Sequence, residues 1–338
     1  MRFGLTYDFR NPPQFHRPPQ DLYEALIDQT VLAEELGFDE IWLTEHHFTE
    51  DGYNPSVLPM AAAIAAKTSL IRIGTFVLVL PFHDPLRVAE DSTIVDLISR
   101  GRFDLGLGMG YTVDEYETLG LDRRTRGARL EEGIEVIQKL WSEDSVTFDG
   151  RFTTLNGARL TPKPIQEPHP PLWIGARAGK AIDRAARLGA NLLTTVGPDP
   201  APEYIAALQR HGRNPDDYEI GQLRLVYCAE TEDQAWEEVA EYLHVSMSYY
   251  GRVMGEVGDV AGDDRMWNFT APDQIRSSGL GRVATIGTPD QVASRLEYWL
   301  EDHHCTQMIC ATHLAGMDPA RSSAAMKLFA EEVMPRFD

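Results

Sequence analysis

The chain alternates between two patterns of hydrophobic and polar positions from one end to the other. Short runs rich in β-branched and aromatic residues are followed by longer stretches whose apolar positions recur with helical spacing. We predict strands at 2–7, 38–44, 71–80, 102–108, 171–175, 191–195, 219–228 and 305–311. We predict helices near 21–36, 55–67, 86–99, 124–141, 180–188, 202–211, 232–246, 289–301 and 319–333.

Eight strands separated by helices predict a parallel sheet, because parallel neighbours need a crossover connection. We expect the sheet to close as a (β/α)8 TIM barrel in a single domain spanning residues 1–338. An open doubly wound sheet is the competing fold. No glycine-rich dinucleotide fingerprint follows the first predicted strand, which counts against that alternative.

Two segments depart from the alternation. Phe148-Asp149-Gly150-Arg151 separates two strand-like runs and predicts a β-hairpin. Residues 249–283 look irregular and are too long for a simple connection. We therefore predict an insertion between strands seven and eight that acts as a lid.

Composition narrows the classes of partner. A formal net charge of −21 argues against nucleic acid, whose phosphates need clustered Lys and Arg. An anionic ligand would be repelled by the chain as a whole, so any phosphate site must be built locally. No apolar run is long enough to span a bilayer, no targeting signal opens the chain, and the three cysteines suit reduced thiols. We expect a cytoplasmic protein.

The second predicted strand ends in Thr44-Glu45-His46-His47-Phe48. Adjacent residues on a strand point to opposite sides, so one histidine at most faces the barrel mouth. Three interpretations stay open at this point. His46 could be a general base or proton donor, since imidazole titrates near neutral pH; one histidine, His47, could bond loop backbone; or the pair could bind a metal. A metal site would need further ligands from other strand ends, and no convincing set is found, so no metal is predicted.

The fourth predicted strand ends in Gly106-Leu107-Gly108-Met109-Gly110. Alternating glycines leave one side of the strand without side chains, where a flat ring could lie against the backbone. Crowded packing inside the barrel is the alternative explanation.

The fifth predicted strand continues into a helix through Gly175-Ala176-Arg177-Ala178-Gly179-Lys180. Small residues expose backbone N–H groups, the helix start carries partial positive charge, and two side chains are cationic. In so acidic a chain, this local cluster predicts a phosphate-binding site at Ala176, Arg177, Ala178, Gly179 and Lys180.

The second predicted helix, at 55–67, is apolar on nearly every face, whereas an outer barrel helix should keep a polar stripe. A covering loop would explain this pattern. We favour burial against the same helix of a second subunit, in a homodimer.

The sequence resembles the bacterial luciferase family of flavin-dependent monooxygenases, in particular the luciferase α subunit. The likeness runs nearly end to end through Phe3-Gly4, Pro12-Pro13-Gln14-Phe15, Gly101-Arg102-Phe103, Gly287-Thr288-Pro289 and Met326-Lys327-Leu328-Phe329. Its most specific element is Glu45-His46-His47-Phe48-Thr49-Glu50.

The resemblance implies a (β/α)8 barrel, reduced flavin mononucleotide (FMN) as cosubstrate, and oxygen activation at the flavin. His46 matches the family's catalytic histidine, and Phe76 and Val77 match a non-prolyl cis peptide beneath the flavin ring. Gly108 stands where luciferase has a reactive cysteine, and Met109 replaces an arginine that helps hold the phosphate. Chemistry that depends on the cysteine cannot operate here, and phosphate binding would lean more on 176–180.

We therefore predict a monooxygenase that uses reduced FMN and O2 on a small organic substrate such as an aldehyde. His46 would be catalytic, and a separate flavin reductase would supply the reduced cofactor. The family also contains enzymes that use a deazaflavin cofactor for hydride transfer, which is the first alternative. A non-catalytic flavin-binding protein is the second, and a sugar-phosphate barrel enzyme is the third.

Overall fold

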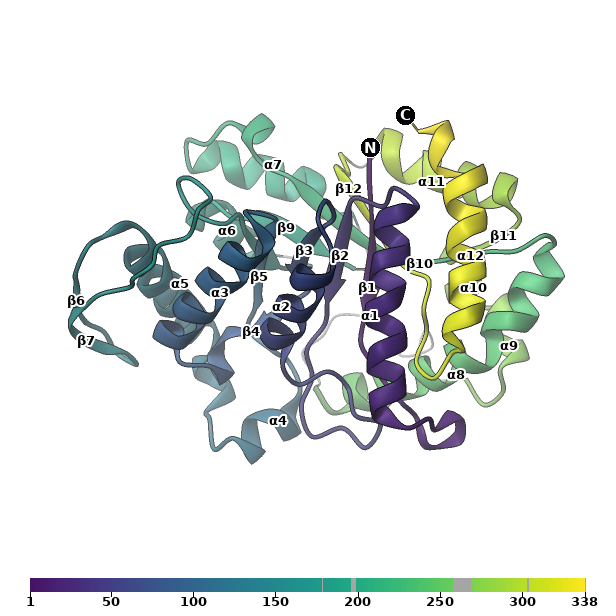
Figure 1. Cartoon of the computed structure of the whole chain (residues 1–338), viewed down its shortest axis with the longest axis horizontal. Helices are drawn as coiled ribbons and strands as arrows, with labels where there is room; N and C mark the ends of the chain where they lie inside the picture. Colours follow the sequence, from purple (N-terminus) through teal and green to yellow (C-terminus); the bar gives the residue numbers. More distant parts are fainter. Residues whose placement is uncertain (178, 196–198, 258–268, 303, 338) are drawn as a thin grey trace.

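A closed parallel barrel forms the centre of the molecule (Figure 1). The structure is a computed structural model that describes residues 1–177, 179–195, 199–257, 269–302 and 304–337. The barrel strands, in order around it, are β1 (Arg2–Tyr7), β2 (Glu40–Leu43), β3 (Arg72–Thr75), β5 (Phe103–Gly108), β8 (Leu172–Gly175), β9 (Asn191–Thr194), β10 (Ile220–Cys228) and β12 (Gln307–Ala311). Parallel pairing of β9 with β10 and of β12 with β1 closes the ring, which confirms the predicted TIM barrel.

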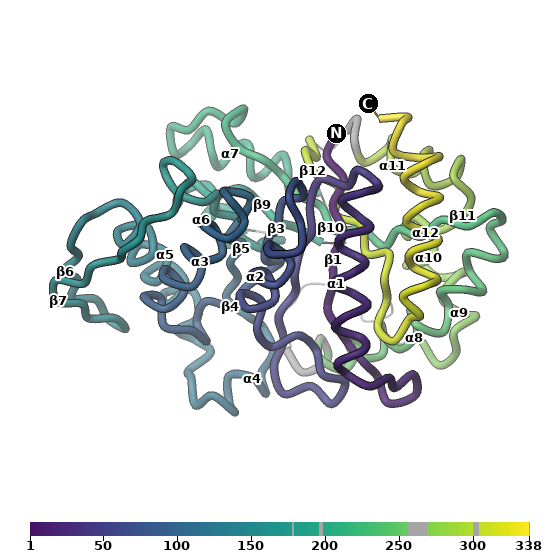
Figure 2. The backbone as a smooth tube through the Cα atoms, viewed as in Figure 1, coloured from purple at the N-terminus to yellow at the C-terminus, as the bar shows by residue number. Residues whose placement is uncertain are grey.

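Helices cover the outside of the barrel, and α1 and α12 run side by side with both chain termini at the same end (Figure 2). The helices are α1 (Pro19–Glu35), α2 (Val57–Lys67), α3 (Pro85–Ser99), α4 (Val113–Thr118), α5 (Arg126–Ser142), α6 (Gly179–Leu188), α7 (Ala201–Arg210), α8 (Glu232–Val257), α9 (Asp273–Ser277), α10 (Gly279–Val283), α11 (Pro289–Asp302) and α12 (Pro319–Glu332). None of the helices in the described ranges combines the length and apolarity that crossing a bilayer requires.

Local sequence explains where the elements begin and end. Helix α3 starts at Pro85, whose ring suits the first helical position, and the Asp84 side chain accepts the backbone N–H of Leu86. It ends at Arg100, which takes a left-handed conformation. Strand β5 is buried at every position, as expected for a strand covered on both faces.

The barrel interior is filled by aromatic side chains. Trp42 and Trp173 meet edge to face with ring centroids 5.4 Å apart, and Leu193 and Ile309 pack with them. Phe76, Val77 and Leu223 lie partly buried against this cluster. The interior is therefore packed core, as in other barrels of this size.

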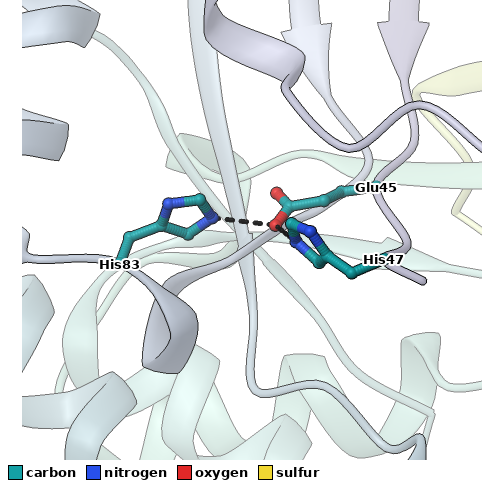
Figure 3. A group of neighbouring side chains, drawn as sticks. All are labelled: Glu45, His47 and His83. Atoms are coloured by element: carbon teal, nitrogen blue, oxygen red, sulfur yellow. Dashed lines mark hydrogen bonds and ion pairs between the residues drawn. The ribbon is translucent and has the colours of Figure 1, made fainter. Parts of the chain in front are cut away.

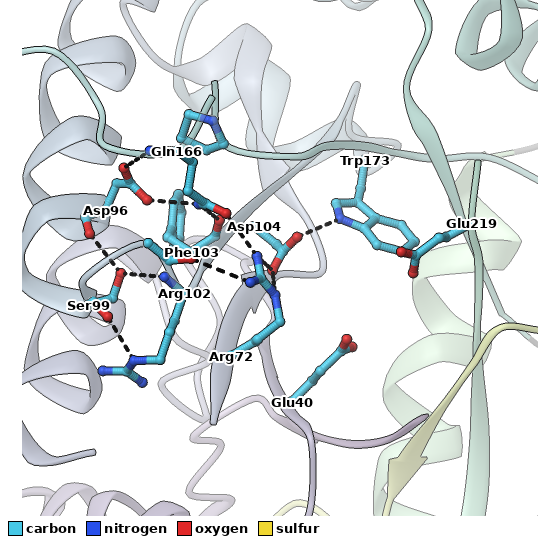
Figure 4. A network of polar contacts seen from close by, with 12 residues as sticks. Glu40, Arg72, Asp96, Ser99, Arg102, Phe103, Asp104, Gln166, Trp173 and Glu219 are labelled. Carbon is cyan, nitrogen blue, oxygen red and sulfur yellow. Dashed lines mark hydrogen bonds and ion pairs between the residues drawn. The ribbon is translucent and has the colours of Figure 1, made fainter. Parts of the chain in front are cut away.

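Polar side chains lie at the end of the barrel where the strands start, which is the end opposite to their carboxyl ends (Figure 4). Arg72 pairs with Asp104 at 2.7 Å, and Asp104 accepts the indole N–H of Trp173. Glu40, which is paired with Arg2, is buried, and burial raises its pKa to about 7. Groups at this end of a barrel serve stability rather than chemistry.

The third predicted strand is interrupted in its middle. Strand β3 ends at Thr75, the Phe76–Val77 peptide bond is cis, and β4 (Leu78–Val79) pairs with β5. The cis peptide expected from the resemblance is confirmed. The prediction of one continuous strand over 71–80 is wrong, because hydrophobicity alone does not record a change of backbone direction.

The predicted hairpin is confirmed, since β6 (Val146–Asp149) and β7 (Thr154–Ala158) pair antiparallel and lie far out from the barrel (Figure 1).

The prediction that 249–283 is irregular is wrong for its two ends. Helix α8 continues to Val257, and α9 and α10 follow at Asp273–Ser277 and Gly279–Val283. Residues 258–268 lie outside the described residues, and a lid function for this region stays a prediction. A short strand, β11 (Thr285–Gly287), pairs with β10 and was not predicted.

Candidate active site

His46 lies just beyond the end of β2, at the face of the barrel formed by the carboxyl ends of the strands. Its Nδ1 atom is 2.9 Å from Oε1 of Glu115, which comes from α4 after β5. The same Glu115 oxygen accepts the backbone N–H of His47 at 2.7 Å. A carboxylate oxygen can only accept hydrogen bonds, so Nδ1 of His46 is the ring nitrogen that carries the proton. In the neutral ring, Nε2 is then the acceptor.

Tyrosine rings surround the His46 imidazole. The Tyr111 hydroxyl lies 3.1 Å from Nε2 of His46. Burial holds the pKa of Tyr111 well above its ordinary value, so this hydroxyl keeps its proton and can donate it in a hydrogen bond. The ring centroids of Tyr53 and Tyr249 lie 4.8 Å and 6.1 Å from the centroid of the imidazole. His46 is 7% exposed, which leaves this proton-carrying group largely shielded from water.

Tyr249 belongs to α8, so that helix completes the enclosure from outside the barrel. Its ring also lies 4.5 Å from the guanidinium carbon of Arg10, which is paired with Asp51. A cavity of about 300 Å³ is lined in part by Arg10, Asp51 and Tyr249. This cavity borders Tyr249 on the side of Arg10, and His46 is not among the residues that line it.

The His47 side chain has different partners from His46, and both histidines lie in the loop after β2 rather than on the strand. Its Nε2 is 2.7 Å from Oε1 of Glu45, and Nε2 of His83 is 2.8 Å from the same oxygen (Figure 3). The suggestion that His47 bonds loop backbone is wrong for its side chain. The statement that no further ligand-type groups join the histidines is also wrong, since Glu45 and His83 converge on His47.

Phe76 and Val77 form part of the floor beside this site. Both are partly buried on the aromatic cluster of the barrel interior, and Phe76 meets Trp42 edge to face at 6.3 Å. They therefore leave apolar surface at the barrel mouth. Such a surface suits one face of a planar, largely apolar ring system.

The glycines at and just beyond the end of β5 are explained by crowded packing. A Cβ at Gly106 would lie 1.8 Å from the backbone oxygen of Thr75, and one at Gly108 would lie 2.3 Å from Cγ2 of Val77. A Cβ at Gly110 would meet Val79 at 2.7 Å. The segment that carries the cis peptide packs against this face of the strand. The glycines therefore make room for that segment and do not by themselves expose a surface on which a flat ring could lie.

The predicted phosphate site lies between β8 and α6. Ala176 is buried, and its N–H bonds the carbonyl of Leu193. Gly179 starts α6 with a φ of +53°, and Lys180 is exposed beside it. Ala178 lies outside the described residues. The start of α6 and the exposed Lys180 lie where the sequence placed them, but the N–H of Ala176, which was expected to be exposed, is already bonded to Leu193. Phosphate binding at this place stays a prediction.

Arg177 lies near Tyr111, the residue that contacts His46. It is partly buried, and burial lowers its pKa below the usual value while leaving it cationic at neutral pH. It lies close enough to Tyr111 to interact with it electrostatically. One side of the barrel mouth thus offers a cation, an apolar floor and an enclosed imidazole, a donor set that fits a flavin with a phosphate tail.

Met109 adds no charge to this set. Its side chain packs partly buried against the main hydrophobic core, and its carbonyl accepts the Tyr116 hydroxyl. The view that phosphate binding leans on the segment after β8 is consistent with this placement. A contact between Met109 and the cofactor stays a prediction.

Sequence reasoning missed Glu115, Tyr111, Tyr53 and Tyr249. Glu115 and Tyr111 follow a barrel strand directly, which is the signal that could have found them. Tyr249 had no such signal, because it lies in the segment expected to be irregular.

Comparisons with known proteins agree with the fold and give the family. A family model described as luciferase-like monooxygenase matches residues 1–304. The oxygenase component of flavin-dependent trigonelline monooxygenase from Acinetobacter baylyi is 27% identical over 100% of this chain and 96% of its own length. An F420-dependent glucose-6-phosphate dehydrogenase from Microbacterium testaceum is 28% identical over 92% of each chain. The crystal structure of the monooxygenase RslO1 from Streptomyces bottropensis superposes with a TM-score of 0.87 at 25% identity, covering 100% of both chains.

Proposed function

The chain belongs to the luciferase-like monooxygenase family, and on this premise we propose that it uses reduced FMN and O2 to oxygenate a small organic substrate such as an aldehyde. Bound FMN would supply the electrons and the site of oxygen activation. The single observation that carries the proposal is the His46–Glu115 pair at 2.9 Å, enclosed by tyrosine rings at the barrel mouth.

Each part of the site has a role in this reaction. Glu115 keeps the proton of His46 on Nδ1, which leaves Nε2 as the basic atom facing Tyr111. His46 can therefore accept a proton at Nε2 and return it. The tyrosine rings exclude water from this exchange, which strengthens the local electrostatics.

We assign cofactor binding to two groups of residues. The ring system would be lined by Phe76 and Val77. Gly108, which lies against Val77, and the next residue, Met109, would complete this lining. Ala176, Arg177, Gly179 and Lys180 would hold the phosphate, with Ala178 assigned from the sequence alone. Support comes from the apolar floor and from the cation that lies partly buried at the start of α6.

A deazaflavin-dependent oxidoreductase is the second candidate, because the relative from Microbacterium testaceum is named for F420 and matches over 92% of the chain. Titrating the apoprotein with reduced FMN and with reduced F420 separates the two by affinity. A non-catalytic flavin-binding protein would bind FMN without oxygenating a substrate, and the bound reduced flavin would only pass its electrons to O2 to give hydrogen peroxide.

The reduced cofactor would come from a separate reductase. The relative from Acinetobacter baylyi is named as an oxygenase component, which supports a two-component system. The cysteines Cys228, Cys305 and Cys310 are free and buried, which supports a cytoplasmic location.

We also propose a homodimer that buries α2. Met60 and Ile64 of this helix pack inside the subunit, whereas Ala62, Ala63 and Ala66 remain partly or fully exposed. On the neighbouring α3, the side chains of Ile94 and Ile98 are 46% and 41% exposed. Together these residues form an apolar strip that covers two adjacent helices.

The proposed function is tested with His46→Ala. Purified wild type and variant are titrated with FMN, and the reduced complexes are then mixed with O2 while flavin absorbance and oxygen uptake are followed. We expect unchanged FMN affinity and a loss of most oxygenation in the variant. Wild-type turnover would remove His46 from the mechanism, and failure of wild type to bind FMN or consume oxygen would refute the proposal as a whole.

A further inference from the structure

Three side chains with metal-binding atoms meet beside the loop after β2, in which Glu45 and His47 flank His46. Nε2 of His47 and Nε2 of His83 both lie within 2.8 Å of one oxygen, Oε1 of Glu45 (Figure 3). All three ligand atoms lie within 4.8 Å of one another. Two imidazole nitrogens and a carboxylate oxygen form a ligand set used by zinc and by other first-row transition metals.

The spacing of these atoms suits a bound ion after a small adjustment. Ligands around a tetrahedral zinc ion sit ~3.3 Å from one another, given bonds of about 2.0–2.1 Å. The two nitrogen–oxygen distances of 2.7 and 2.8 Å would therefore open by roughly half an ångström. His83 can supply this movement, because its side chain is 30% exposed and follows a short 3-10 turn.

Burial and charge at the cluster also favour a cation. The Glu45 side chain is fully buried, and its other oxygen accepts the backbone N–H of Val79 at 3.2 Å. The histidine side chains are 16% and 30% exposed, which leaves a path from solvent and room for water as a further ligand. The net charge of −21 draws cations toward the protein.

We propose that Glu45, His47 and His83 bind one divalent transition-metal ion. The ion would join the end of β2, one residue before His46, to the segment that follows β4. It would thereby hold the floor formed by Phe76 and Val77 in place relative to His46. This site lies outside the proposed flavin chemistry and does not depend on it.

Zinc binding to the full-length protein tests the proposal. Protein stripped with a chelator is titrated with zinc by calorimetry, and cobalt is used as a spectroscopic probe of the ligands. We expect one zinc ion per chain, and an absorption spectrum typical of nitrogen and oxygen ligands. Replacing a ligand, as in His83→Gln or His47→Gln, should weaken zinc binding about 10-fold or more.

His211→Gln is the matched control, because His211 also pairs with a carboxylate, Asp183, but on the surface. It should bind zinc like wild type. Circular dichroism confirms that each variant is folded, and FMN affinity is measured separately. The proposal is overturned if wild type shows no saturable binding up to millimolar zinc. It is equally overturned if His83→Gln and His47→Gln both keep wild-type affinity, since the ion would then occupy an adventitious site.

Discussion

One carboxylate oxygen, Oε1 of Glu115, holds the Nδ1 atom of His46 at 2.9 Å and fixes the orientation of its ring. Glu115 is itself held in place, because it is 2% exposed and also accepts the backbone N–H of His47. The imidazole is thus oriented by a residue from the connection after β5, which β3 separates from β2 in the barrel. This arrangement makes Glu115 a positioning residue for the proposed proton transfer.

Replacing Glu115 by Gln should lower kcat without weakening FMN binding. The amide can no longer select the Nδ1-protonated form of His46, because it offers a donor as well as an acceptor. We expect a loss of about 100-fold in kcat and a changed pH profile. Glu117→Gln, an exposed position on the same helix, is the control. An unchanged pH profile together with wild-type kcat would show that Glu115 has only a structural role.

Replacing Arg177 by Met should weaken binding of FMN but not of riboflavin, which lacks the phosphate. Losing one charge-assisted hydrogen bond costs about 1.5–3 kcal/mol, or roughly 10- to 100-fold in Kd. Flavin fluorescence quenching measures both affinities. Arg187→Met, at the far end of α6 and paired with Glu131, should leave both unchanged. Equal weakening of the two flavins by Arg177→Met would place the phosphate elsewhere.

Replacing Gly106 by Ala should destabilise the protein severely. The added Cβ would lie 1.8 Å from the backbone oxygen of Thr75, which cannot rotate away as a side chain would. We expect a loss of more than about 3 kcal/mol in urea unfolding, or no soluble protein. Gly255→Ala in α8 meets no atom within 4 Å and should be neutral or slightly stabilising. Native-like stability of Gly106→Ala would mean that the segment after β3 packs differently.

Replacing His313 by Gln should reduce the loss of stability in acid. His313 is buried, and burial lowers its pKa to about 3, whereas the unfolded chain has a value near 6.5. Below pH 6.5 the unfolded state therefore binds a proton that the folded state does not, and stability falls as pH decreases toward 3. This single proton contributes a slope of about 1.4 kcal/mol per pH unit between these two values.

Gln can keep the hydrogen bond to Ser322, so the variant should lose the slope without losing the fold. Urea unfolding between pH 7 and pH 5 measures the difference from wild type. His211→Gln, at the surface, should keep the wild-type slope. If His313→Gln also keeps the wild-type slope of stability against pH, His313 is protonated in the folded protein.

Replacing Ile94 by Asp should produce a monomer if α2 and α3 form the dimer interface. A carboxylate in an apolar interface loses its hydration without gaining a partner. Light scattering at micromolar concentration gives the mass. Ile165→Asp is the matched control, because Ile165 is 48% exposed and lies on neither helix. A monomeric wild type would refute the homodimer, and a dimeric Ile94→Asp would move the interface elsewhere.

The barrel could be predicted because each of its elements carries a local signal. Strand β5 is recognisable from its apolar run and helix α5 from the helical spacing of its apolar positions. The break after Thr75 could not be derived from hydrophobicity, because the run from 71 to 80 is apolar throughout. It was predicted only because the sequence resembles a family with a cis peptide there.

The residues of the candidate site also fall into two groups, those that local sequence could indicate and those that only the fold brings together. His46 could be selected because it ends a barrel strand, and Arg177 because it precedes a helix. The partners of these residues depend on contacts across the fold: Glu115 is 69 positions from His46, and His83 is 38 positions from Glu45. No spacing rule joins such pairs, so their convergence became visible only with the strands in place.

Tyr249 touches His46 on one side and Arg10 on the other, yet it belongs to a helix outside the barrel. The His46 imidazole and part of its enclosure are therefore encoded in separate stretches of the gene. Mutation can reshape the enclosure through α8 while the strands that hold His46 stay constant. An enzyme built in this way can evolve toward new molecules without having to invent a new reaction.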